Sequence, residues 1–158
     1  MKLKTVEPQT VFFHATTTTI PGLMDLTLKI PPKLFLELEK TKSKTTGPIS
    51  WHYYGMDGNP ETEFQLEIAI PVDKSSEYQG EFGFKSLGEF KCVSLIHEGS
   101  WTTINKGYEK LIQETIKAGY ALAFESREIY HNIKTAEDEK NKRFDALDNV
   151  TEIQMKLQ

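Results

Sequence analysis

Apolar and polar residues alternate along much of the chain, and this pattern predicts a protein built largely from β-strands. Residues 2–18 alternate and are rich in Val, Phe and Thr, which predicts one long strand or two short ones. The alternation is cleanest over residues 63–72. Phe64, Leu66, Ile68 and Ile70 lie on one face there, and Glu63, Gln65, Glu67 and Ala69 lie on the other. Further strands are expected over residues 49–54, 80–97, 121–131 and 150–157.

Helical spacing of apolar residues occurs in each half of the chain. In the second half, a stripe begins after Ser100, a good N-cap, and ends before Gly119, a good C-terminal cap. Its members are Trp101, Ile104, Tyr108, Leu111 and Ile112. In the first half, we expect Pro31-Pro32 to end a short helical segment over residues 23–30 and to open a second helix that ends near Lys44.

The order of these elements is strand, helix, strand, strand, and it occurs twice, over about residues 2–72 and 80–158. The length of 158 residues suits a single domain, residues 1–158, and the pattern predicts an α+β fold. We expect two helices on one face of antiparallel sheets and a central ligand cleft between the halves, on the opposite face. The charged segment 134–148 is expected to be a solvated loop or a short exposed helix.

Charge and composition limit the function classes. The net charge is −4 and no stripe of Lys or Arg stands out, which argues against direct binding of nucleic acid. Cys92 is the only cysteine, so no intrachain disulfide forms. No apolar run reaches the roughly 20 residues of a membrane span, and no apolar segment follows the first four residues. We therefore expect a cytoplasmic protein that does not bind membranes.

The sequence contains no recognisable motif for a cofactor or a metal ion. The histidines are His14, His52, His97 and His131, and none has metal-ligand spacing to another ligand. There is no P-loop, no Gly-x-Gly-x-x-Gly and no Gly-x-Ser-x-Gly. We expect no metal site and no cofactor, haem included.

Glu128 and Tyr130 are the leading candidates for a binding site. Residues two apart in a strand project from the same face, so the strand expected over residues 121–131 presents both together. A carboxylate among aromatic rings suits a flat or hydrophobic cation, because the acid supplies charge and the rings supply cation–π and dispersion contacts. The alternative is a surface glutamate paired with Arg127 or with a lysine.

Other aromatic and acidic residues extend this candidate site. Trp51 and Tyr53 share one face of a strand, and we assign them to the pocket rather than their neighbours His52 and Tyr54 on the other face. The remaining candidates each have an alternative in the core or on a solvated face: Tyr108, Tyr130, Glu67 and Trp101.

Four stretches of the sequence form a recognisable set: Gly47 to Gly55, Glu67 to Val72, His97 to Trp101 with Tyr108, and Glu128 to Tyr130. Together they resemble the GyrI-like small-molecule-binding domains, which also serve as effector-binding modules of AraC-type and MerR-type multidrug regulators. The resemblance covers nearly the whole chain and implies paired βαββ modules with pseudo-twofold symmetry. It also implies that Glu128 lies at the floor of the ligand pocket. The segment from Asn132 to Asn149 is longer than usual for that family.

Three functions follow from the residues and from the resemblance. The first is binding of amphipathic or cationic aromatic molecules, as a stand-alone sensor or sequestering protein, monomer or dimer. The second is hydrolysis of strained, cyclopropane-bearing toxic compounds, with Glu128 as the base and Tyr130 or Tyr108 as the acid. The third is an inhibitory or protective interaction with a larger protein, of the gyrase-inhibitor type. Binding without catalysis is the preferred reading.

Overall fold

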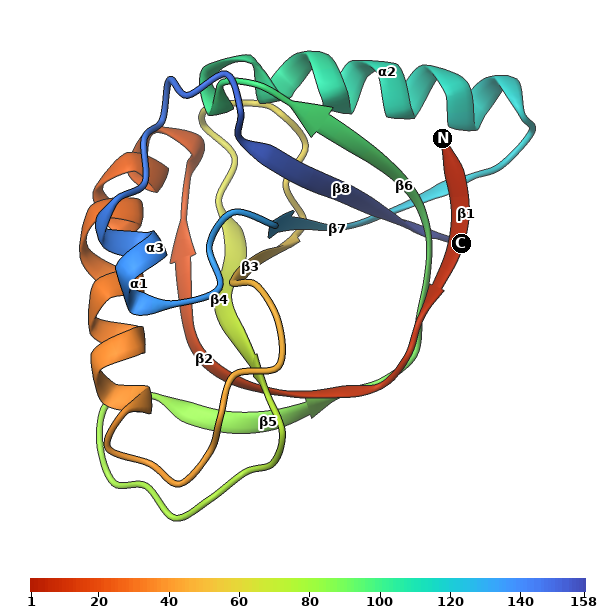
Figure 1. Cartoon of the computed structure of the whole chain (residues 1–158). Helices are drawn as coiled ribbons and strands as arrows, with labels where there is room; N and C mark the ends of the chain where they lie inside the picture. The colour runs from red at the N-terminus through yellow and green to blue at the C-terminus, as the bar shows by residue number, and fades with distance from the viewer.

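The computed structural model describes all of residues 1–158 and contains one antiparallel sheet of eight strands (Figure 1). The strands are β1 (Lys2–Val6), β2 (Gln9–Thr18), β3 (Ser50–Tyr54), β4 (Phe64–Val72), β5 (Gly83–Leu87), β6 (Phe90–Glu98), β7 (Leu122–Tyr130) and β8 (Val150–Leu157). Their order across the sheet is β1-β6-β8-β7-β3-β4-β2-β5. The α+β fold predicted from the sequence is confirmed.

The two long helices lie on the outer side of the curved sheet (Figure 1). Helix α1 (Leu23–Leu38) follows a short 3₁₀ turn, η1 (Ile20–Gly22), and packs on β2 and β4. Helix α2 (Ile104–Lys117) follows a second 3₁₀ turn, η2 (Trp101–Thr103), and packs on β6. A short helix, α3 (Ala136–Lys140), lies against α1. No helix is both long enough and apolar enough to cross a membrane.

The sheet order repeats under a pseudo-twofold exchange of the two halves of the chain. Units β2-α1-β3-β4 and β6-α2-β7-β8 are equivalent, and they meet where β3 pairs with β7 at the centre of the sheet. The edge strands are exchanged: β1 precedes β2 in sequence but pairs with β6, and β5 precedes β6 but pairs with β2. Each half is therefore completed by a strand from the other half, which the linear pattern did not reveal.

Helix α1 differs from the sequence-based prediction. It runs without interruption through Pro31 and Pro32, which were expected to divide it, and it ends at Leu38 rather than near Lys44. Proline lacks the N–H that would bond the carbonyl four residues earlier, so Pro31 leaves the carbonyl of Thr27 without its helical donor. Lys142 Nζ supplies a donor to that carbonyl at 2.7 Å. The helix also buries an apolar stripe of Ile30, Pro31, Leu34, Phe35 and Leu38. Burial of that stripe outweighs the local preference to break.

Gly107 on α2 packs directly against a side chain of the sheet. A Cβ at this position would lie 2.8 Å from Ile153 Cδ1, and Ile153 is fully buried with Val93 and Leu111. We expect Gly107→Val to destabilise the fold by about 1–3 kcal/mol, because the buried contact has no room to expand. Urea denaturation measures this change. Gly88→Val is the matched control, since nothing lies within 4 Å of a Cβ there, and equal stability of the two variants would contradict the expectation.

Candidate functional site

The central strands β3 and β7 bring the main candidate residues together on the helix-covered face. Trp51 pairs directly with Glu128, and Tyr53 pairs with Ser126. Directly paired residues in an antiparallel sheet project from the same face with their Cβ atoms about 5 Å apart. The two strands come from different halves of the chain, so this arrangement exists only in the complete fold.

The Glu128 carboxylate is buried, with 6% of the residue exposed, and it accepts hydrogen bonds from three phenols. Tyr108 on α2 donates to Oε1 at 2.8 Å, and Tyr53 on β3 donates to Oε2 at 3.1 Å. Tyr130 on β7 also donates to Oε2. Glu128 takes part in none of the ion pairs of the chain. It is a buried acid with phenolic donors and no cationic partner.

Burial controls the ionisation of this cluster. Desolvation raises the pKa of Glu128 above the ordinary value of 4.5, and the three phenol hydrogen bonds oppose that rise because they favour the carboxylate. Burial also raises the pKa of Tyr53, Tyr108 and Tyr130 well above 10, and the nearby Glu128 raises it further. The phenols therefore remain neutral donors. They reduce the cost of the buried charge, but they do not neutralise it.

A cavity of about 180 Å³ lies beside Glu128, between α1 and the start of α2. Most of its lining is hydrophobic, and each layer of the fold contributes to it. Its lining residues are Leu23, Met24, Thr27, Pro31, Ile49, Trp51, Tyr53, Trp101, Ile104, Glu128, Tyr130, Ile133, Glu139, Lys142 and Phe144. Glu128 is the acid that the sheet contributes to this apolar space.

Aromatic rings form edge-to-face contacts along one wall of the cavity. Trp101 lies with its ring centroid 5.4 Å from that of Tyr130 and 5.4 Å from that of Phe144, nearly perpendicular to each. Trp51 contacts Tyr130 in the same way at 6.3 Å. The indole of Trp101 is held by a hydrogen bond from Nε1 to Thr151 Oγ1 at 3.0 Å. The rings are thus fixed in orientation by neighbouring side chains.

The segment over residues 134–148 closes another side of the cavity. Its ends are held by adjacent positions of β7 and β8, with His131 N bonded to the carbonyl of Val150 at 3.0 Å. Lys142 pairs with the buried Glu139 and reaches the Thr27 carbonyl of α1. The carbonyl of Phe144 accepts from Trp101 N at 2.9 Å. The charged segment is therefore docked on α1 and on the 3₁₀ turn η2 as part of the cavity wall.

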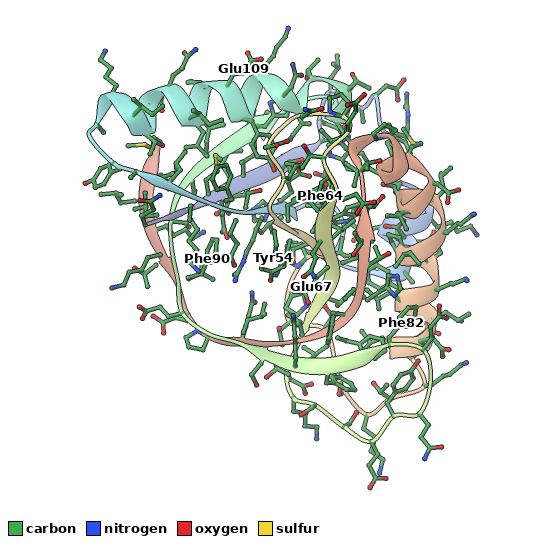
Figure 2. All side chains as sticks on the ribbon, turned by 180° about the vertical axis from the view of Figure 1, so that it is seen from behind. Tyr54, Phe64, Glu67, Phe82, Phe90 and Glu109 are labelled. Atoms are coloured by element: carbon green, nitrogen blue, oxygen red, sulfur yellow. The ribbon has the colours of Figure 1, made fainter.

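The structure places the sequence-predicted candidates in three locations. Five of them line the cavity: Trp51, Tyr53, Trp101, Glu128 and Tyr130. Tyr108 does not line it, but holds the carboxylate through its hydroxyl. Glu67 is on the other face of the sheet, near Tyr54 (Figure 2), which donates to Oε1 at 2.7 Å. Lys85 pairs with Oε2 of Glu67. Assigning Glu67 to this pocket was wrong, because the opposite face of β4 packs against the helices.

The expected position of the cleft also needs correction. It lies on the helix-covered face, between α1 and α2, and not on the opposite face. The cavity includes residues that the sequence reasoning did not identify, among them Leu23, Met24 and Thr27. These belong to the first turns of α1, which were predicted as a short separate helical segment and not assigned to the site. Phe144 carried a signal, since it is one of the few apolar residues in a charged stretch. No group of three or more His, Cys, Asp or Glu side chains is arranged to hold a metal ion.

An apolar cavity with fixed aromatic walls and one buried acid outside any ion pair, Glu128, defines a small-molecule-binding domain. The sequence agrees with this class, because residues 1–145 match the GyrI-like small molecule binding domain family. The chain belongs to the GyrI-like family. A comparison with curated protein sequences found no match.

Solved structures share the fold at low sequence identity. The chain is similar to EcmrR in its DNA complex, with a TM-score of 0.80 and 21% identity, over 99% of this chain and 56% of that one. It is also similar to the separate EcmrR C-terminal domain, with a TM-score of 0.76 and 21% identity over 99% and 96% of the two chains. SAV2435 bound to tetraphenylphosphonium has a TM-score of 0.68 and 12% identity, over 99% and 93%. This chain thus spans about half of the EcmrR chain seen with DNA.

Proposed function

We propose that the cavity binds hydrophobic cations with aromatic groups and that Glu128 neutralises their charge. The observation that carries this proposal is the buried carboxylate at an aromatic cavity, with three phenol donors but no positive partner. A buried charge is costly unless it is paired, and a cationic ligand provides the missing charge. The rings of Trp51, Tyr53 and Trp101 add dispersion and cation–π contacts.

The similarity to SAV2435 supports this chemistry. That protein binds tetraphenylphosphonium, which is a hydrophobic cation with four aromatic rings, and it shares the fold over nearly the whole chain. At 12% identity the likeness concerns the fold alone. The proposal for this chain therefore rests on its own Glu128 cluster, and we propose in addition that binding serves to sense or sequester such compounds.

Intrinsic fluorescence tests the proposal directly. The chain has two tryptophans, Trp51 and Trp101, and both line the cavity. We expect tetraphenylphosphonium to change their emission with saturation. Tetraphenylborate is the matched control, because it has the same shape and the opposite charge. Equal affinity for the two ions would refute the proposed role of charge.

Hydrolysis is a second candidate function, favoured by the raised pKa of Glu128 and its contact with Tyr130. A buried glutamate with a raised pKa suits a general base, and a phenol is a suitable acid. However, Tyr108, Tyr53 and Tyr130 already occupy three of the roughly four acceptor sites of the carboxylate, which leaves it a weak base toward a water. Binding is therefore the better-supported function. A turnover assay with a strained cyclopropane substrate separates the two, since Glu128→Gln would abolish hydrolysis but only weaken binding.

Cation binding should weaken as the solution is acidified, and it should do so at a higher pH than in a site whose carboxylate has an ordinary pKa. Burial raises the pKa of Glu128, so this acid takes up its proton when the pH falls through a value above 4.5. The protonated acid cannot neutralise a cation, and affinity falls as the pH falls through that window. Titrations of tetraphenylphosphonium between pH 8 and pH 5 measure the change. The same titrations with Glu128→Gln should show no such dependence, and a persisting one would assign the effect to another group.

A further inference from the structure

The face of the sheet opposite the helices carries a second polar cluster that the proposed cation site does not use. One rung across the sheet places His52 of β3, Arg127 of β7 and Gln154 of β8 in directly paired positions. Side chains so paired project from the same face about 5 Å apart. All three residues are buried, with 1%, 4% and 3% of their surface exposed. They line one cavity of about 170 Å³.

Arg127 is the unusual member of this cluster. Its guanidinium lies 3.7 Å from the ring centroid of Phe90, but Arg127 takes part in none of the ion pairs of the chain. Its Nε–H has no hydrogen-bond partner although the atom is fully enclosed. A guanidinium presents several donors in a planar fork that suits oxyanions. A buried one without an acceptor indicates that a ligand supplies the acceptor.

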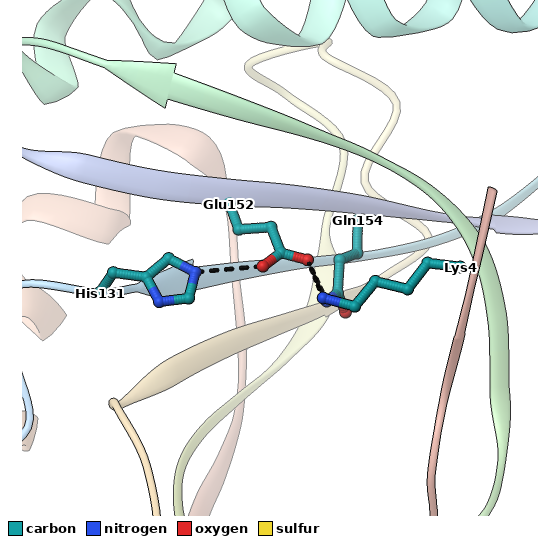
Figure 3. Close-up of polar contacts among 4 residues, drawn as sticks. All are labelled: Lys4, His131, Glu152 and Gln154. Atoms are coloured by element: carbon teal, nitrogen blue, oxygen red, sulfur yellow. Dashed lines mark hydrogen bonds and ion pairs between the residues drawn. The ribbon is translucent and has the colours of Figure 1, made fainter. Parts of the chain in front are cut away.

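Carboxylates near Arg127 on this face are already paired with lysines. Glu152 Oε2 pairs with Lys4 at 2.8 Å, and its Oε1 lies 3.1 Å from His131 Nε2 (Figure 3). Glu125 pairs with Lys156 at 2.8 Å, and Glu67 pairs with Lys85. Each of these carboxylates is thus neutralised by a lysine, and the positive charge of Arg127 has no negative partner. An anion entering the cavity meets a net positive site.

Two further unpaired atoms define what else the anion must carry. Gln154 donates from Nε2 to Glu152 Oε2 at 2.7 Å, which leaves its buried Oε1 free to accept (Figure 3). His52 Nε2 lies 2.8 Å from Ser50 Oγ, and its Nδ1 has no partner. Burial holds the pKa of His52 well below its usual range, so the ring is neutral. The cavity thus offers the Arg127 donor fork and an acceptor at Gln154 that needs an O–H.

The cavity has a side toward solvent. Its rim includes Thr46, which is exposed, and Gln9 and Gly47, which are half-buried. A small solute can therefore reach Arg127 without entering the Glu128 cavity on the other face of the sheet.

We propose that this cavity is a second binding site, which takes a small oxyanion carrying a hydroxyl group, such as a 2-hydroxycarboxylate. The anion accepts from Arg127 and donates its hydroxyl hydrogen to Gln154. The proposal is independent of cation binding, because the Glu128 and Arg127 side chains lie on opposite faces of the sheet.

Nuclear magnetic resonance of the ¹⁵N-labelled wild-type chain tests the site without altering the fold. Arg127 and Arg143 are the only arginines, and Arg143 is exposed, so the arginine Nε–H region contains one buried and one surface signal. Arg143→Lys assigns them. Lactate should shift the Arg127 signal with saturation and leave the Arg143 signal unchanged. Inorganic phosphate is titrated in parallel, since its monoanion also has hydroxyl groups. Comparison of the two titrations shows whether the site prefers a phosphate or a carboxylate.

Propionate tests the role of the hydroxyl. It resembles lactate without that group, and we expect its Kd at Arg127 to be at least about tenfold higher. Gln154→Met should raise the Kd for lactate and leave that for propionate unchanged. Failure of both lactate and phosphate to move the Arg127 signal, or equal movement of the two arginine signals, would overturn the proposal. Equal affinity for lactate and propionate would overturn the part assigned to Gln154.

Discussion

Glu128→Gln should lower the affinity for tetraphenylphosphonium about 5- to 150-fold while the chain stays folded. The substitution preserves size but removes the buried negative charge. Losing one desolvated charged contact costs about 1–3 kcal/mol, and each 1.4 kcal/mol is about a factor of ten in affinity. The glutamine oxygen still accepts hydrogen bonds from Tyr53, Tyr108 or Tyr130, so the packing of the three phenols is largely kept.

Tryptophan fluorescence titration measures this loss, and thermal unfolding of the same samples verifies the fold. Glu67→Gln is the matched control, because it removes a carboxylate from the opposite face of the same sheet. That control should keep wild-type affinity. A Glu128→Gln variant that binds the cation as tightly as wild type would remove the charge from the recognition mechanism.

Deletion of residues 134–147, bridged by a short Gly/Ser link, should give a folded chain that binds the ligand at least about tenfold more weakly. The ends of the segment are close, since Tyr130 pairs with Thr151 where β7 meets β8. A shorter connection costs little entropy. The deletion removes Phe144, Lys142 and Glu139 from the cavity wall. Phe144 is half-buried, so loss of its contact is worth about 1.4 kcal/mol, near the lower end of the value for a fully buried side chain.

Two point variants show which side chain of the segment accounts for the loss of affinity. Phe144→Ala should reproduce most of the affinity loss, because its ring contacts Trp101 at the cavity. Leu147→Ser should change nothing, since Leu147 is 84% exposed and lies outside the cavity. Cooperative thermal melting near the wild-type temperature is expected for all three variants. A molten or insoluble deletion product would show that the segment belongs to the core of the second half.

The strands and α2 could be predicted because their signals are local. Alternation fixes the faces of β4, and Ser100 and Gly119 mark the ends of the second helical region. Helix α1 was predicted as two separate segments because two prolines oppose a continuous helix locally, whereas its stability comes from packing of Leu34 and Phe35 in the core. Strand exchange was missed, because β1 and β2 are adjacent in sequence and nothing local indicates that β1 pairs with β6.

Only those site residues could be predicted that share one strand or that match a motif of the resembled family. The spacing of Glu128 and Tyr130 placed both on one face, but the hydrogen bond from Tyr108 depends on how α2 packs over the sheet. The error at Glu67 has the same origin. Alternation separates the two faces of β4, but whether the cavity lies under the helices or on the opposite face depends on how α1 and the start of α2 are spaced over the sheet.

Exchange of the edge strands also bears on how the chain folds. Lys2 pairs with Ser94, and Gln9 pairs with Leu87, so neither half can complete its sheet before the other has been made. Such distant pairings slow the search for the native state and join the halves in one cooperative transition. A chain cut between residues 72 and 80 would therefore yield two fragments that are each short of one strand. We expect these fragments to recover native structure only when mixed, because β1 of one fragment then pairs with β6 of the other, and β5 pairs with β2.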